Sequence, residues 1–241
     1  MPGTDRSAAA APPVSVVVPV YRNAETLEEL HRRLDAALGA AGVDFELVFV
    51  EDACPAGSLA VLRRLEALDP RVGVLPLPRN VGQHAAVLRG LARARGRAVV
   101  VMDADLQDPP DAVPALLARL AQGPAAVFAG RRGRYESLGR LATSRLFKRA
   151  LHVLLGLPAD AGMFVAMDRR MVERVLAMDA SRPFVVAMIG CAGLPLDSLP
   201  VARAPRPSGR SAYRSWRRLA VGVFAMSWAF GYRLRARRSR A

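Results

Sequence analysis

Two carboxylates and one carboxamide follow an apolar run near the middle of the chain. The run covers residues 98–101, and Asp103, Asp105 and Gln107 follow it at alternate positions. Unpaired charge is costly at the end of a hydrophobic strand, so these side chains need a partner there. Hard divalent cations such as Mg²⁺ or Mn²⁺ prefer oxygen ligands of this kind. The spacing therefore predicts a cation site, and a cation held at a strand end could bind a diphosphate.

The start of a helix is the alternative interpretation of this segment. Asp108 is a suitable N-cap residue, Pro109 suits a first helical turn, and Asp111 follows closely. This interpretation explains Asp108 and Asp111 but gives no reason for the positions of Asp103 and Asp105. We therefore favour the cation site for the latter two.

Alternating strand and helix patterns surround the segment and must position it. Apolar runs predict strands at 14–20, 45–50, 72–75, 98–103, 125–129 and 164–167. Helical spacing of apolar residues predicts helices at 25–41, 59–68, 81–94, 112–120, 141–155 and 169–178. We expect loops at 130–139 and 200–211. This alternation indicates an α/β fold with a Rossmann-like, mostly parallel sheet and helices on both faces. Ligand sites in such sheets lie at the carboxyl ends of the strands.

The positive charge of the chain is large and unevenly placed. The net charge is +14, and no acidic residue follows Asp197, whereas arginines continue to Arg240. A basic tail suggests an anionic partner, which could be nucleic acid, a membrane surface or a phosphorylated substrate. We expect no nucleic acid, because the chain carries no recognised nucleic-acid-binding motif.

The two ends of the chain differ from its middle. Residues 1–13 are rich in Ala and Pro without the pattern of a signal peptide, and we expect a flexible N-terminus. Residues 214–241 predict an amphipathic, Arg-rich C-terminal helix that suits an anionic membrane surface. Packing on the domain or on a second subunit, as in a homodimer, is the alternative. No stretch reaches the roughly 20 apolar residues that span a bilayer. We expect a cytoplasmic protein, peripheral at the inner face of the cell membrane.

Several short motifs lie along the chain, most of them at predicted strand ends or in the loops that follow them. They cover residues 16–21, 79–82, 102–110, 143–147 and 209–213. With these motifs the chain resembles the family-two inverting glycosyltransferases, which have a GT-A fold. It is most similar to the branch of dolichol-phosphate mannose synthases and bacterial polyprenyl-phosphate glycosyltransferases. The resemblance covers residues 14–213, and its most specific part is Asp-Ala-Asp-Leu-Gln-Asp-Pro-Pro at 103–110.

The resemblance implies a role for each motif in an enzyme of the hexosyltransferase type. The residues that it assigns to the nucleotide sugar are Pro19, Tyr21, Asn23, Asp52, Gly82, Asp103, Ala104, Arg131 and Arg206. It assigns Mg²⁺ or Mn²⁺ to Asp103, Asp105 and Gln107. The residues that it implies for catalysis are Asp103, Asp105, Arg131 and Asp160. Asp52 would accept a hydrogen bond from the base, and Arg131 and Arg206 would hold phosphate oxygens. The activity implied is metal-dependent, inverting sugar transfer from a GDP- or UDP-linked donor to a polyprenyl phosphate.

Several positions depart from the pattern of these enzymes, including residues 51–56, where only one central Asp, Asp52, is kept. Met163 and Val165 stand where many bacterial relatives have an acidic residue and an arginine, and Ala212 stands in place of a lysine. Asp160 lies close in sequence and could partly substitute for the missing acid. Two alternatives therefore stay open: transfer to a soluble natural-product or metabolite acceptor, and nucleotide binding without catalysis. We expect His84, at a predicted helix start, to be a surface or capping histidine.

Overall fold

The computed structural model of the protein describes residues 13–132 and 155–202. The first half contains β1 Val14–Val20, η2 Ala24–Thr26, α1 Leu27–Ala40, β2 Phe45–Glu51, α2 Ser58–Leu68, β3 Val72–Pro76, α3 Gln83–Arg93 and β4 Ala98–Val101. The second half contains η3 Pro110–Ala112, α4 Val113–Leu120, β5 Ala126–Arg132, β6 Val165–Asp168, α6 Arg169–Leu176, α7 Val185–Cys191 and β7 Leu196–Ala202. The predicted flexible N-terminus before Pro13, almost all of the predicted helix at 141–155 and the predicted C-terminal helix lie outside the described residues.

The strands form one mostly parallel sheet, as predicted. Their order is β3-β2-β1-β4-β6-β5-β7. Strands β3, β2, β1 and β4 are parallel, and β7 is parallel to β5, while β6 runs antiparallel to both β4 and β5. Because β6 is antiparallel, its first residue, Val165, pairs with Val101 of β4 and with Phe128 of β5. The segment that leads into β6 therefore lies where β4 and β5 end.

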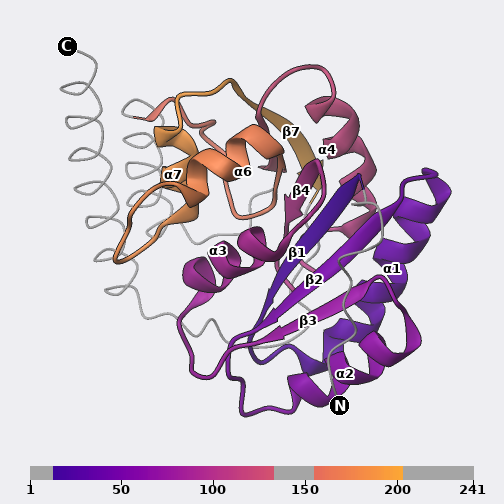
Figure 1. The fold of residues 1–241 in the computed structure, drawn as a ribbon. Coiled ribbons are helices and arrows are strands. Elements are labelled where there is room, and N and C mark those ends of the chain that lie inside the picture. The colour runs from indigo at the N-terminus through magenta and orange to yellow at the C-terminus, as the bar shows by residue number, and fades with distance from the viewer. Residues whose placement is uncertain (1–12, 133–154, 203–241) are drawn as a thin grey trace.

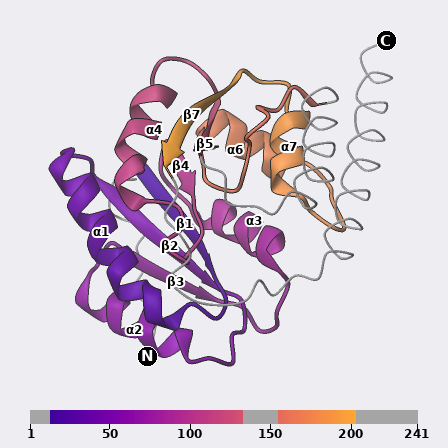
Figure 2. The same cartoon turned by 180° about the vertical axis from the view of Figure 1, so that it is seen from behind.

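Helices cover both faces of the sheet, which confirms the prediction. Residues of α1, α2 and α4 pack in one core with Val16 and Val18 of β1, and residues of α3, α6 and α7 pack in another with Val17. Figures 1 and 2 show the sheet between these two groups of helices from opposite sides. The division follows from strand geometry, because successive side chains of a strand point to opposite faces. The helices supply matching apolar stripes, such as Leu27, Leu30, Leu34 and Leu38 of α1.

Two elements were not predicted from the sequence. Helix α7 is buried along almost its whole length, so it lacks the polar face that gives a helical period. Strand β7 extends past Pro200, the residue at which a loop was predicted to begin. The strand lies at the edge of the sheet, where proline is tolerated. Strand β5 also continues to Arg132, beyond the loop start expected at Gly130, because β7 pairs with it to that residue. Among the described residues, no helix is long and apolar enough to cross a membrane.

A network of charged side chains ties α1 and α2 to the start of β3. Asp69 accepts hydrogen bonds from Arg71 Nε at 3.0 Å and Arg71 Nη2 at 2.9 Å, and lies 2.8 Å from His31 Nε2. Arg71 also donates to Asp35, and its guanidinium lies 4.5 Å from the ring centroid of Phe45. Burial raises the pKa of Asp69, but the hydrogen bonds from Arg71 and His31 outweigh it and lower the pKa to about 2.

We expect Asp69→Asn to destabilise the protein by about 1 kcal/mol at pH 7, after allowance for solvent screening. Because the folded-state pKa of Asp69 is depressed, its stabilisation is complete above its ordinary pKa and is lost as pH falls towards about 2. The difference from the wild type should therefore shrink between pH 4 and pH 2. Urea unfolding across this range measures it, with Asp44→Asn in the exposed loop before β2 as the control. A difference that does not change with pH would contradict the assignment.

Candidate active site

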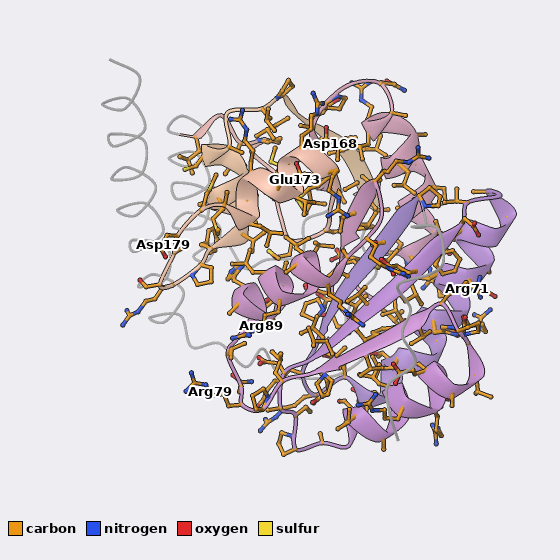
Figure 3. The ribbon with its side chains drawn as sticks, viewed as in Figure 1. Arg71, Arg79, Arg89, Asp168, Glu173 and Asp179 are labelled. Atoms are coloured by element: carbon orange, nitrogen blue, oxygen red, sulfur yellow. The ribbon has the colours of Figure 1, made fainter. Side chains whose placement is uncertain are left out.

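Three loops meet where the parallel strands β1, β2 and β4 end, an edge of the sheet that we call the carboxyl edge. Val20, the last residue of β1, pairs with Glu51, the last of β2, and its carbonyl accepts the Asp52 N–H at 3.0 Å. Val17 of β1 pairs with Val101, the last residue of β4. The loops that begin at residues 21, 52 and 102 are therefore neighbours, as the sequence analysis expected. Figure 3 shows Arg71 and Arg79 beyond opposite ends of β3, so the Asp69 network lies away from this edge.

Backbone strain gathers in these three loops. Within residues 13–132 and 155–202, the only non-glycine residues with positive φ are Arg22 at 60°, Ala53 at 49° and Leu106 at 58°. Each of the three loops contains one of them. Such conformations cost of order 1–3 kcal/mol each and persist where the surrounding structure enforces them, which is common at functional sites. The strain therefore supports a functional role for the carboxyl edge.

The loop after β4 carries the predicted cation ligands. Asp105 Oδ1 accepts the backbone N–H of Gln107 at 3.1 Å, and Leu106 between them has the positive φ. Thr26 Oγ lies 2.5 Å from the Ala104 carbonyl oxygen and 3.0 Å from that of Asn23, which joins this loop to the one after β1. The interpretation of Asp108 as the N-cap residue is wrong, because Pro109 occupies the N-cap position of η3.

The donor set of this loop fits a hard divalent cation. Asp103 and Asp105 supply carboxylate oxygens and Gln107 an amide oxygen, and Mg²⁺ or Mn²⁺ accepts all of them. Across the part of the chain that the structure describes, no three His, Cys, Asp or Glu side chains gather as a metal site. The proposed ligand set therefore depends on the amide of Gln107 and on oxygens from a substrate or water.

Asp52 is almost completely buried at the end of β2. The residue is 3% exposed, and its carboxylate oxygens accept the backbone N–H groups of Val81 at 2.7 Å and Gly82 at 2.9 Å. Asn80 Nδ2 donates to the Asp52 carbonyl at 3.1 Å. Each carboxylate oxygen has a second lone pair, so the hydrogen bond to a base stays a prediction. Gly82 has φ of 84° at the N-cap of α3, a conformation that favours glycine.

The first turn of α3 contacts the loop after β4 and the start of α7. Gln83 Nε2 donates to Asp103 Oδ1 at 2.6 Å. His84 Nδ1 accepts the Val185 N–H at 3.4 Å, and its ring centroid lies 4.6 Å from that of Phe184. Burial lowers the pKa of His84 to about 4, so the ring is neutral at pH 7. The expectation of a surface or capping histidine at the start of its own helix is therefore wrong: Gly82 occupies the N-cap position of α3, and the buried His84 ring accepts the first N–H of α7.

Cys54 belongs to the loop after β2, next to the strained Ala53. Its sulfur accepts the backbone N–H groups of Arg22 at 3.0 Å and Ala56 at 3.3 Å, and the Ser58 hydroxyl lies 3.5 Å away. Burial raises the pKa of the thiol, but these three hydrogen bonds outweigh it, so the pKa lies below its ordinary value. The sulfur thus joins the loops after β1 and β2.

The segment before β6 brings Asp160 to the end of β5. A Cβ atom added to Gly130 would lie 1.9 Å from Asp160 Oδ2, so only glycine leaves room for the carboxylate there. The Phe164 carbonyl accepts the Ala129 N–H at 2.9 Å, which fixes the segment beside β5. Met163, where the resemblance implied an acidic residue, is half-buried and packs against the core on the side of α3 and α7.

The predicted site residues divide into two groups, and further contacts join them. The structure brings Pro19, Tyr21, Asn23, Asp52, Gly82, Asp103, Ala104, Asp105, Gln107 and Asp160 to the carboxyl edge. Arg131 belongs to β5 and pairs with Val201, but its side chain lies outside what the structure describes, as does all of Arg206. Thr26, Gln83 and Cys54 are contacts that the sequence analysis missed. Gln83 has one signal, its place directly after the turn glycine that begins α3.

Comparison with known proteins gives one family and a group of relatives. The profile of Glycosyl transferase family 2 matches residues 15–176. One relative is the undecaprenyl-phosphate 4-deoxy-4-formamido-L-arabinose transferase of Pseudomonas paraeruginosa (strain DSM 24068 / PA7). The chain is 38% identical to it over 209 aligned residues, and the aligned region covers 86% of this chain and 62% of that protein. The chain is 32% identical over 202 residues to the uncharacterized glycosyltransferase YkcC of Bacillus subtilis (strain 168), with 83% and 62% covered. The chain thus spans less than two thirds of these relatives.

Solved structures share the fold. The mannosyltransferase PcManGT from Pyrobaculum calidifontis, in complex with GDP-Man and Mn²⁺, matches with a TM-score of 0.65 and 22% identity over 94% of this chain and 65% of that one. The glucosyl-3-phosphoglycerate synthase of Mycobacterium tuberculosis, in complex with Mn²⁺, UDP and glucosyl-3-phosphoglycerate, matches with a TM-score of 0.62 and 20% identity over 92% and 80%. The predicted GT-A fold is thereby confirmed.

The contact between Gly130 and Asp160 can be tested by a double-mutant cycle. We expect Gly130→Ala to destabilise the wild type and to be about 1 kcal/mol less harmful in an Asp160→Ala background, because the added methyl group then meets no carboxylate. Urea unfolding of the four proteins measures this coupling. Gly39→Ala in α1, where an added Cβ meets nothing within 4 Å, should act equally in both backgrounds. Equal effects of Gly130→Ala in both backgrounds would contradict the contact.

Proposed function

Because the chain belongs to Glycosyl transferase family 2, we propose that it is a metal-dependent, inverting glycosyltransferase of the hexosyltransferase type. It moves a sugar from a GDP- or UDP-linked donor to a polyprenyl phosphate. The observation that carries the proposal is the meeting of the Asp52, Asp103 and Asp105 loops at one strained edge of the sheet. A site whose carboxylates lie in neighbouring loops, one of them buried, suits a nucleotide diphosphate only together with a cation.

The donor lies across the carboxyl edge in this proposal. Tyr21, which is 41% exposed, contributes with Pro19 and Asn23 to the nucleoside pocket, and Asp52 accepts a hydrogen bond from the base. Asp103, Asp105 and Gln107 hold Mg²⁺ or Mn²⁺. The bound cation would neutralise charge on the leaving diphosphate. The support is the oxygen-only donor set, together with the Mn²⁺ and nucleotide named for two structural neighbours.

In this proposal, two arginine side chains bind the phosphate groups of the donor. Arg131 and Arg206 hold phosphate oxygens of the donor, since a guanidinium can bind two of them at once. Arg131 directly follows Gly130, beside Asp160, in the strand that ends next to the acceptor-side segment.

The absence of an acidic residue at Met163 favours an acceptor whose attacking group is a phosphate. A phosphate is already ionised at neutral pH, so its oxygen attacks the anomeric carbon without a side chain to take a proton. The sugar–phosphate bond to the diphosphate breaks in the same step, and the anomeric configuration inverts. The lack of an acid at Met163 is therefore compatible with turnover, and in this proposal Asp160, beside Gly130, partly substitutes for that acid. The undecaprenyl-phosphate substrate in the name of the Pseudomonas relative supports this choice.

The basic C-terminal residues place the enzyme at its acceptor in this proposal. Residues 214–241, whose sequence predicts an amphipathic helix, bind the inner face of the cell membrane, where a polyprenyl phosphate resides. Residues 14–213 form the catalytic domain. Packing of this helix against a second copy of the chain, as a homodimer, is the competing arrangement.

The proposal is tested with the purified full chain, a panel of GDP- and UDP-sugars, Mn²⁺ and undecaprenyl phosphate. We expect release of nucleotide diphosphate that depends on both metal and lipid. Asp105→Asn should lower kcat by about 100-fold or more, because it removes a charged cation ligand. Asp111→Asn is the matched control, since Asp111 lies in the same acidic segment but pairs with Arg33.

Two results would replace this proposal by an alternative. Sugar transfer to a soluble acceptor in the absence of lipid would assign the chain to natural-product or metabolite chemistry. A rise in melting temperature with nucleotide and Mn²⁺, without transfer from any donor, would identify a nucleotide-binding protein that lacks catalysis.

A further inference from the structure

A neutral side chain outside the predicted ligand set holds one of the cation ligands. Gln83, the first residue of α3, donates from Nε2 to Asp103 Oδ1 at 2.6 Å. Both side chains are half-buried at the carboxyl edge. The contact joins two loops that come after different strands, so it fixes the carboxylate relative to α3 rather than within its own loop.

The residues on both sides of Gln83 are tied to other elements. The N–H groups of Val81 and Gly82 bind the buried carboxylate of Asp52 at 2.7 and 2.9 Å. His84, on the other side, accepts the N–H of Val185 at the start of α7. The backbone that carries Gln83 is therefore anchored to β2 and to α7, and its amide meets Asp103 from a fixed position. A functional group is well positioned when the residues that support it are themselves held.

An amide suits the task of orienting a cation ligand. A carboxylate beside a lysine or arginine would have its charge compensated, which would compete with a divalent cation, whereas a carboxamide donates a hydrogen bond without adding charge. The hydrogen bond at Oδ1 limits the rotation of the Asp103 carboxylate. Partners of this kind set the orientation of metal ligands, and their loss typically costs 10–100-fold in metal affinity or activity.

We propose that Gln83 is a positioning residue that holds the Asp103 carboxylate in the orientation that binds the divalent cation. The inference rests on the proposed function, because it needs a cation at Asp103. A purely structural role at the start of α3 makes a different prediction, since it would lower the melting temperature of the metal-free protein and leave its cation affinity unchanged.

Gln83→Met tests the proposal, because methionine keeps the length of the side chain and removes the donor. Titration of Mn²⁺ in the presence of UDP or GDP, with free Mn²⁺ read by electron paramagnetic resonance, should show Kd for Mn²⁺ raised about 10–100-fold. In turnover, the apparent KM for Mn²⁺ should rise by a similar factor, while kcat at saturating Mn²⁺ stays near that of the wild type. Gln122→Met, in the exposed turn after α4, is the matched control and should change neither constant.

Further outcomes separate this inference from the function on which it rests. If the wild type binds no Mn²⁺ with either nucleotide, the proposed function fails and the inference fails with it. If the wild type binds Mn²⁺ and Gln83→Met binds it equally well, only the inference is overturned, whatever the melting temperature. Gln83→Asn keeps an amide at the helix start but shortens it by one methylene group. It should show the same loss of Mn²⁺ affinity, and it replaces Gln83→Met if that variant does not fold.

Discussion

The buried carboxylate of Asp52 is the interaction on which the carboxyl edge depends. The carboxylate of a residue that is only 3% exposed requires hydrogen-bond donors, and the N–H groups of Val81 and Gly82 supply them. This requirement draws the loop after β3 across the end of β2 and sets where α3 begins. The position of Gln83 against Asp103 and of His84 against α7 follows from that starting point. One buried charge thus connects the nucleoside side of the site, its cation side and the helix behind them.

The loops of this edge are built for position rather than for stability. Arg22, Ala53 and Leu106 adopt left-handed backbone conformations that a loop under no constraint would avoid. Hydrogen bonds between the loops hold them, through Thr26 to the Ala104 carbonyl and through the Arg22 N–H to the Cys54 sulfur. The free energy gained by burying the two hydrophobic cores offsets the cost of this backbone strain. These cores lie on either side of the sheet and contain the strands that the loops follow.

Patterns of short period made the fold predictable from the sequence. Apolar runs and leucine spacing locate β1, α1 and β4, and the polar residues after β4 point to the site because strands of a parallel sheet end together. Helix α7 could not be predicted because it is buried almost throughout and has no polar face. Strand β7 could not be predicted because Pro200 suggests a loop. The contact of Gln83 with Asp103 joins residues that are distant in sequence and leaves no local pattern. Sequence reasoning found the charged groups of the site and Gly82, which binds Asp52, but it missed the contacts made by Thr26, Gln83 and Cys54.

A crystal of the protein grown with Mn²⁺ and a nucleoside diphosphate tests the central claim most directly. The anomalous signal of manganese locates the cation without reference to activity. The account predicts a single strong peak between the diphosphate and the side chains of Asp103, Asp105 and Gln107, with the nucleoside beside Asp52. A nucleotide bound at another edge of the sheet, or a peak that none of these three side chains contacts, would contradict it.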